Sequence, residues 1–297
     1  MPESSPVQAV GFPGQGGDWR AAIAILGAHP DAPEAVALAD RLGTDRWTDL
    51  DQRDTRASQP VVVASGLLGA RLAGLGAARP LGVVGHSLGE ITAACFAGAL
   101  TLESALDLAV LRAELGHRAE AERPGQMVAV MRLPVAEVEW LRRSVLARRP
   151  GVLEVAVVNS PTQVVLSGDR ALGEAVLVEV EAAGGVGHRL PIGGAFHSPV
   201  MAGAVAPFAE ALRAALRRPR LPVVTSALPA ARTDPGELAD AMARCLVLPV
   251  DWPGTIAALA GLGVTAAVDA GPGDTLVRLA RYEPGVAFSP LPAVDPT

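Results

Sequence analysis

Short apolar runs alternate along most of this chain with longer segments in which apolar residues recur every three to four positions. The short runs are typical of buried strands, and the longer segments are typical of amphipathic helices. The predicted strands cover residues 7–12, 81–84, 222–226 and 265–269. The predicted helices cover residues 21–26, 58–75, 90–97, 102–118, 199–218, 237–245 and 254–262. Because strands alternate with helices, we expect an α/β fold with a mostly parallel sheet.

A different order of elements begins after the segment Arg123-Pro-Gly-Gln126. The pattern there predicts strands at 127–131, 154–158, 163–166 and 188–192, with helices at 135–147 and 171–183. This β-α-β-β-α-β order is that of a ferredoxin-like module. We therefore expect a ferredoxin-like small subdomain over residues 124–192. It is inserted into an α/β-hydrolase-like large subdomain formed by residues 1–123 and 193–297.

Composition excludes several classes of function. The net charge of −6 argues against nucleic acid as the main partner. No apolar run reaches the roughly 18 residues of a membrane span, and residues 1–6 lack the basic and apolar segments of a secretory signal. The two cysteines, Cys95 and Cys245, do not form a disulfide or metal-binding pattern, so we expect a cytoplasmic protein without a bound metal. All 25 basic residues are arginine, which rules out a lysine nucleophile or Schiff base.

The segment Gly85-His-Ser-Leu-Gly89 carries the clearest chemical signal. It follows a predicted strand and precedes a predicted helix, which is the context of a Gly-x-Ser-x-Gly nucleophile elbow. The tight turn requires the two flanking glycines to lack side chains and places the Ser87 hydroxyl near the positive end of the helix. An ordinary tight turn is the alternative, because this pattern also arises by chance in glycine-rich chains.

A serine nucleophile needs a base within hydrogen-bond reach. The five histidines are at positions 29, 86, 117, 188 and 197. The side chain of His86 is expected to diverge from that of Ser87, whereas His197 lies where a strand meets the helix-start signal Ser198-Pro199. A His197 that only caps local backbone is the alternative. No carboxylate with a persuasive local context is available to orient it, although three aspartates follow in the chain, Asp251, Asp269 and Asp274.

Several further segments occur in the order seen in one enzyme family. These are Phe12-Pro-Gly-Gln-Gly16, Ser58-Gln-Pro60, Gly85-His-Ser-Leu-Gly-Glu90, Asn159-Ser-Pro-Thr-Gln-Val-Val-Leu-Ser-Gly168, Gly194-Ala-Phe-His-Ser198, Pro249-Val-Asp-Trp252 and Gly271-Pro-Gly273. With them the chain resembles the malonyl-CoA:acyl-carrier-protein transacylases, a family that includes the acyltransferase domains of polyketide and fatty-acid synthases. The resemblance covers nearly the whole chain.

The resemblance implies a catalytic pair. Ser87 is the acylated nucleophile and His197 is its general base, oriented by a main-chain carbonyl at the position of Cys245 rather than by a carboxylate. The backbone N–H groups of Gln15 and Leu88 form the oxyanion hole, which suits a glycine-rich turn and a helix start that both present free donors.

The resemblance also implies a substrate site. Arg112 matches the arginine that holds the free carboxylate of a malonyl group, for which a permanently charged planar fork is suited. A surface arginine paired with Glu114 or Asp107 is the alternative. Phe196 would fill the space that an α-methyl group needs, which favours malonyl over methylmalonyl by about 1–3 kcal/mol. Gln59 is implied as a further substrate-binding residue.

Three residues depart from the family pattern. Gly116 stands where a methionine is usual, Cys245 stands where a glutamine or asparagine is usual, and Asp18 replaces a glutamine in the first glycine-rich block. Cys245 as a second nucleophile is less favoured than Cys245 as a buried structural thiol. An Asp18 carboxylate near the mouth of the site could disfavour a dianionic ligand or merely face solvent.

The resemblance therefore implies an acyltransferase that moves a malonyl or related acyl group from acyl-CoA to the phosphopantetheine thiol of an acyl carrier protein, by way of an acyl-Ser87 enzyme. No bound cofactor is implied. We expect a discrete, monomeric, trans-acting protein of polyketide or fatty-acid biosynthesis. Two alternatives stay open: an editing acyl-carrier-protein hydrolase or a transferase of an unusual acyl group, and a non-catalytic docking protein. For the carrier protein, clustered arginines at 142, 143, 148 and 149, or at 217, 218 and 220, are candidates by charge alone.

Overall fold

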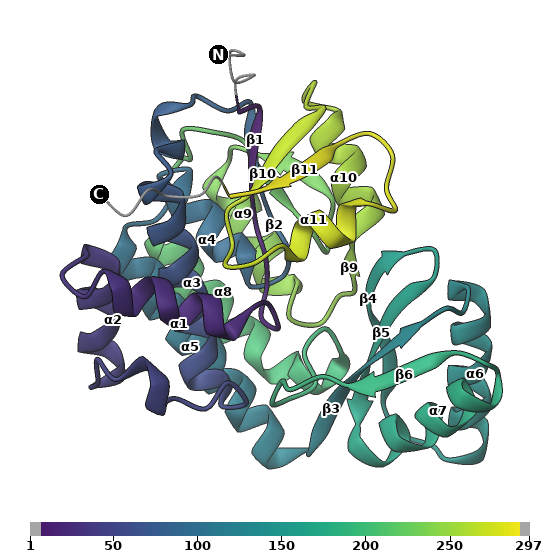
Figure 1. Cartoon of the computed structure of the whole chain (residues 1–297). Coiled ribbons are helices and arrows are strands. Elements are labelled where there is room, and N and C mark those ends of the chain that lie inside the picture. The colour runs from purple at the N-terminus through teal and green to yellow at the C-terminus, as the bar shows by residue number, and fades with distance from the viewer. Residues whose placement is uncertain (1–6, 292–297) are drawn as a thin grey trace.

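A computed structural model describes residues 7–291 of the chain. Residues 1–6, on which the expected absence of a secretory signal depends, lie outside the described residues. The chain forms a larger part that contains both of the described ends, and a smaller part beside it that contains the middle of the sequence (Figure 1). The mixed α/β class predicted from the sequence is confirmed, and it takes the form of two separate sheets.

The sheet of the larger part has six strands in the order β11-β10-β1-β2-β7-β8. Their bounds are β1 Ala9–Phe12, β2 Gly82–Gly85, β7 Val223–Thr225, β8 Ala230–Arg232, β10 Ala266–Asp269 and β11 Ala287–Pro290. All neighbouring strands are parallel except β7 and β8, which pair antiparallel. The carboxyl ends of β1 and β2 therefore lie at the same edge of the sheet, and both lead into glycine-rich turns.

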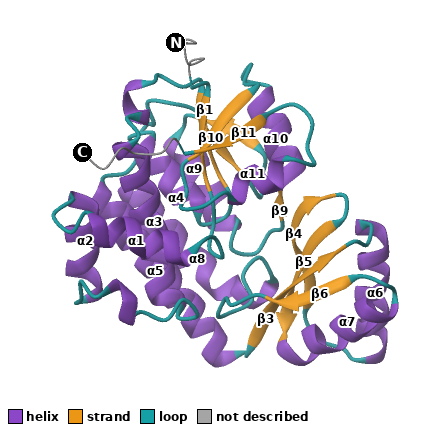
Figure 2. Cartoon of the chain, in the orientation of Figure 1, coloured by secondary structure: helices purple, strands orange, loops and turns teal. Residues whose placement is uncertain are grey.

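Helices cover both faces of this sheet, as the colouring by secondary structure makes clear (Figure 2). Their bounds are α1 Trp19–Ala28, α2 Pro33–Leu42, α3 Thr55–Leu72, α4 Gly89–Phe96, α5 Leu102–Glu122, α8 Ala202–Ala215, α9 Pro235–Arg244, α10 Trp252–Ala260 and α11 Thr275–Ala280. Strand residues such as Val10 and Val83 pack on one side with α3, α4 and α5. Their neighbours Ala9 and Val84 face the other side, against α10 and α11. This alternation buries both faces of the strands, as expected for a parallel sheet.

The smaller part holds a five-stranded sheet in the order β6-β3-β5-β4-β9. Its elements are β3 Gly125–Met131, α6 Val135–Arg148, β4 Leu153–Ser160, β5 Gln163–Asp169, α7 Arg170–Ala182 and β6 Val186–Arg189, with β9 Val250–Asp251 added from a distant segment. One face of the sheet, including Val128 and Val164, packs against α6 and α7. The opposite face, including Met127 and Val165, faces the larger part and lines a cleft.

The structure differs from the sequence prediction mainly at short elements. Helix α2, strands β8, β9 and β11 and helix α11 were not predicted; the strands have two to four residues, too few to show a period. Strand β6 begins at Val186 and ends at Arg189, whereas residues 188–192 were predicted. The turn at Gly184-Gly185 starts the strand early, and the chain leaves the sheet before Pro191. The subdomain boundaries at 124 and 192 stay a prediction.

None of the helices within residues 7–291 combines the length and the apolar composition needed to cross a membrane.

Candidate active site

The nucleophile elbow lies between β2 and α4. Ser87 has φ +54°, a left-handed conformation that is costly for a residue other than glycine. A side chain on Gly85 would overlap the backbone nitrogen of Glu90, and one on Gly89 would overlap the carbonyl oxygen of Phe12. Both glycines are therefore required by the close approach of backbone, as the motif predicts.

The loop before α8 brings His197 to Ser87. The Nε2 atom of His197 lies 2.7 Å from the Oγ atom of Ser87, although the two residues are 110 positions apart. His197 is 3% exposed and has φ +61°, so both members of the pair have left-handed backbone. This contact fits a base poised to accept the serine proton.

Backbone carbonyls orient the imidazole ring. The Nδ1 atom of His197 lies 2.6 Å from the carbonyl oxygen of Cys245 and 3.2 Å from that of Leu248. Because carbonyl oxygens only accept hydrogen bonds, Nδ1 carries the proton and the lone pair of Nε2 faces Ser87. The three candidate aspartates make local contacts and do not orient His197. Asp251 and Asp269 accept hydrogen bonds from nearby backbone N–H groups, and Asp274 precedes α11.

Burial and the nearby Arg112 guanidinium lower the pKa of His197 to about 3. The ring is therefore neutral at physiological pH, which is the form that can take a proton. His86 turns away from Ser87, as expected: its Nε2 lies 3.1 Å from the Oδ1 atom of Asn159, and its ring packs against Trp252. His188 is exposed and lines the cleft.

The two expected oxyanion-hole residues lie close to the nucleophile: Leu88 follows Ser87 in the chain, and Gln15 lines the same cleft. The backbone N–H groups of Gln15 and Leu88 donate no hydrogen bond to another residue in the described part of the chain. The Gln15 loop fits tightly on the elbow, since a Cβ added to Gly14 would lie 2.7 Å from the carbonyl oxygen of His86. Free N–H donors beside a nucleophile are suited to stabilising an oxyanion.

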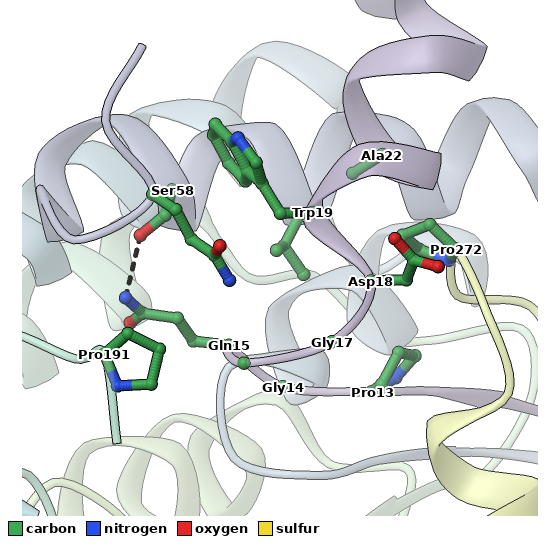
Figure 3. Close-up of a pocket in the computed structure, with 13 residues that line it drawn as sticks. Pro13, Gly14, Gln15, Gly17, Asp18, Trp19, Ala22, Ser58, Pro191 and Pro272 are labelled. Atoms are coloured by element: carbon green, nitrogen blue, oxygen red, sulfur yellow. Dashed lines mark hydrogen bonds between the residues drawn. The ribbon is translucent and has the colours of Figure 1, made fainter. Parts of the chain in front are cut away.

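Side chains behind this loop hold it in place. The Gln15 amide donates to the Ser58 hydroxyl at 2.7 Å, and Figure 3 shows this contact at one end of a small pocket, with Asp18 at the other end beside Pro272. Gln59 is fully buried and donates to the Gln15 side chain at 3.3 Å. It does not line the main cleft, and its role in substrate binding stays a prediction. Asp18 is exposed and caps the start of α1 by accepting from the N–H of Ala21.

Arg112 projects from α5 into the same site. Its side chain is buried, with the residue 5% exposed, and its Nη2 atom lies 3.2 Å from the Oγ atom of Ser87. The surface alternative is therefore wrong, and Asp107 pairs with Arg41 instead. No carboxylate oxygen within residues 7–291 comes within salt-bridge distance of the Arg112 guanidinium, and burial lowers the pKa of this group. A buried cation without a carboxylate partner is suited to binding an anion.

Phe196 completes the wall beside Arg112. Its ring centroid lies 4.6 Å from the guanidinium carbon, which is within cation–π distance. The ring also packs on the backbone of α5, because a Cβ added to Gly116 would lie 2.5 Å from its Cζ atom. Gly116, which departs from the methionine usual in the family, therefore leaves the space that this ring fills.

Ser87, His197, Arg112 and Phe196 all line a cleft of about 550 Å³ between the two parts of the molecule. The facing sheet supplies a mostly apolar wall with Asn159 and Gln163, and α11 and the turn after it supply Arg278, Arg281 and the exposed Tyr282. These polar residues were not predicted as part of the site. The only available signal was that Asn159 begins one of the family blocks. Within the described chain there is no group of three or more histidine, cysteine or acidic side chains arranged to hold a metal.

Comparison with known proteins agrees with this geometry. Residues 12–282 match the model of the acyl transferase domain family. The chain belongs to that family. It is 30% identical over 288 residues to the malonyl CoA-acyl carrier protein transacylase of Haemophilus influenzae, covering 92% of this chain and 91% of that protein.

Two other acyl transferase relatives show the range of the family. The spectinabilin polyketide synthase system protein NorA' of Streptomyces orinoci is 39% identical over 225 residues, which are 70% of this chain but 6% of that much longer protein. A malonyl-transacylase solved in complex with a type II polyketide synthase acyl-carrier protein, PlMCAT:AntF, superposes with a TM-score of 0.83 at 25% identity. That alignment covers 97% of this chain and 96% of the other.

Proposed function

We propose that this acyl transferase moves a malonyl group from malonyl-CoA to the phosphopantetheine thiol of an acyl carrier protein. The observation that carries the proposal is the buried Arg112 guanidinium, which has no carboxylate partner among the described residues and lies 3.2 Å from the Ser87 hydroxyl. A thioester carbonyl placed at Ser87 would put the free carboxylate of a malonyl group within reach of this cation.

The first half-reaction acylates the enzyme. Ser87 Oγ attacks the thioester carbonyl carbon while its proton passes to His197 Nε2. The N–H groups of Gln15 and Leu88 stabilise the negative charge on the carbonyl oxygen. The tetrahedral intermediate then expels the CoA sulfur, which takes the proton from His197, and leaves a malonyl ester on Ser87.

The second half-reaction runs in the reverse direction with a different thiol. The phosphopantetheine thiol gives its proton to His197 Nε2 and attacks the ester carbonyl. Collapse of the intermediate returns that proton to Ser87 Oγ and releases the malonyl thioester. Two carbonyl acceptors at Nδ1 support the transient imidazolium by charge–dipole contact, in the role that a carboxylate has in a triad.

Phe196 favours malonyl over α-branched units in this proposal. Its ring lies over the carboxylate-binding guanidinium and is 3% exposed, so an α-substituent directed toward it would meet a packed wall. Gln59 would act through Gln15, whose side chain it contacts, by holding the oxyanion loop.

The cleft also supports a route for CoA and for the carrier protein. Arg281 and Arg278, of which Arg278 also pairs with Asp274 at 3.3 Å, line the cleft, and their charge suits the phosphates of CoA and phosphopantetheine. The arginines of α6 suit the carrier less well. Arg142 and Arg143 pair with Glu139, and α6 packs on the face of the sheet opposite the cleft. A cytoplasmic enzyme that acts as a monomer completes the proposal; the two free thiols support the cytoplasmic location.

For the fold, we propose an α/β-hydrolase-like core with a ferredoxin-like insertion over residues 124–192. The strand–turn–helix elbow in a parallel sheet supports the first assignment. The order β6-β3-β5-β4 with α6 and α7 on one face supports the second.

Intact-mass measurement after mixing the protein with malonyl-CoA tests the proposal. A malonyl adduct is expected on the wild type and not on Ser87→Ala, and holo carrier protein should remove it as malonyl-carrier product. An editing hydrolase would instead release free acetate from acetyl-loaded carrier without malonyl transfer. A docking protein would give no adduct at all.

A further inference from the structure

Ser226 lies directly beneath the nucleophile elbow, just after β7. Its Oγ atom accepts a hydrogen bond from the backbone N–H of Ser87 at 3.1 Å. Its own hydroxyl and backbone N–H both donate to the Oε1 atom of Glu90, each at 2.7 Å. Ser226 is 0% exposed and Glu90 is 2% exposed, so water does not compete for these contacts.

The direction of these hydrogen bonds is fixed by their donors. The Ser226 hydroxyl has one proton, and that proton is given to Glu90. A lone pair of the same oxygen therefore points at the N–H of Ser87. The Ser226 carbonyl accepts from the N–H of Asp251 at 2.8 Å, so the main chain of Ser226 is also held in place.

The elbow depends on such a restraint because of its backbone conformation. Ser87 is held at φ +54°, which an unrestrained serine avoids. Rotation of its peptide toward a relaxed conformation would move the Oγ atom away from His197 and turn the N–H of Leu88. The N–H of Ser87 would also lose its buried acceptor.

We propose that Ser226 and Glu90 are positioning residues that hold the strained peptide of Ser87, so that its hydroxyl stays aligned with His197. Neither residue lines the cleft that contains Ser87 and His197. The inference rests on the proposed function only in taking Ser87 as the nucleophile. It does not depend on which acyl group is transferred.

A small phosphonofluoridate that labels activated serines tests the alignment without any need for CoA or malonyl recognition. The variant is Ser226→Ala, and the matched control is Ser167→Ala, which removes an equally buried hydroxyl from β5 with no link to the elbow. Labelling of Ser226→Ala is expected to be slower by about 10- to 100-fold, as for a misplaced reacting group. Ser167→Ala should label at the wild-type rate. Glu90→Ala removes the oxygen that accepts both hydrogen bonds from Ser226, so it should also label more slowly than wild type.

Single-turnover acylation by malonyl-CoA separates positioning from general damage. The maximal rate constant of Ser226→Ala should fall, whereas the malonyl-CoA concentration at half-maximal rate should not change. If Ser226→Ala does not fold, Ser226→Cys keeps a side chain of nearly the same size with a weaker acceptor, and should label at a rate below wild type. A folded Ser226→Ala or Ser226→Cys that labels as fast as wild type overturns the inference. A wild-type protein that is not labelled at Ser87 overturns the proposed function itself.

Discussion

The ring of Phe196 occupies the space that a side chain at position 116 would fill. A Cβ added to Gly116 would lie 2.5 Å from the ring Cζ atom, well inside van der Waals contact. The same ring lies over the Arg112 guanidinium, one helical turn earlier in α5. The glycine at position 116 therefore leaves room for the Phe196 ring to pack against both α5 and Arg112.

Gly116→Ala is expected to lower the free energy of unfolding by about 1–3 kcal/mol, since the packed ring has to move. It should also lower kcat/KM for malonyl transfer, because the displaced ring no longer supports Arg112. Gly203→Ala is the matched control: this exposed glycine in α8 has open space at its Cβ, so the change should give a gain of up to about 1 kcal/mol. Denaturant unfolding measures both changes. A Gly116→Ala protein as stable as wild type would contradict the close packing of Phe196 on Gly116.

Arg112→Ala is expected to reduce kcat/KM for malonyl-CoA by roughly 30- to 100-fold, which corresponds to the loss of about 2–3 kcal/mol of charge-assisted hydrogen bonding. Transfer from acetyl-CoA, which has no carboxylate to bind, should be spared or improved. Arg112→Lys keeps the charge without the planar fork, so its kcat/KM for malonyl-CoA should lie between that of wild type and that of Arg112→Ala. Steady-state rates with both acyl-CoAs check this, and equal loss for both donors would mean that Arg112 is only structural.

The pH dependence of Ser87 labelling is a separate prediction. The pKa of His197 is held at about 3 by burial and by Arg112, so the neutral base persists as the pH falls. Labelling by an uncharged probe should therefore be nearly independent of pH between about 5 and 8. Arg112→Ala removes a like charge, which lets the pKa rise toward its usual 6.5 and moves the acidic loss of rate to higher pH. If the labelling rate of wild type falls with an apparent pKa near 6.5, the prediction is wrong.

Cys245→Ala should keep transferase activity close to that of wild type. His197 is held by the carbonyl oxygen of residue 245, which the substitution leaves in place. Burial raises the pKa of the Cys245 thiol well above its usual value, so the thiol stays protonated and is a poor nucleophile. The small cavity should cost about 1 kcal/mol of stability. Loss of acylation in a stably folded Cys245→Ala protein would reinstate the thiol as a reacting group.

The elbow could be predicted from the sequence because the crowded backbone there requires glycine at positions 85 and 89, which gives a recognisable local motif. The burial of Arg112 could not be predicted, since α5 carries charged residues along much of its length and the Phe196 ring that packs on this one is 84 positions away. The pair Glu90–Ser226 was not predicted either. A glutamate in an otherwise apolar helix start was a signal, but its partner is 136 positions away and no local period links them.

Strand β9 lies between α9 and α10 of the larger part in the sequence, but it forms an edge strand of the sheet of the smaller part. Val250 and Asp251 pair with Val157 and Val158 of β4, two residues after the Leu248 carbonyl that contacts His197. A chimera that exchanges residues 124–192 between family members would therefore join a foreign β4 to the native β9. Exchange of the loop 245–251 together with the insertion would keep the native pairing of β4 with β9 beside the cleft that Ser87 lines.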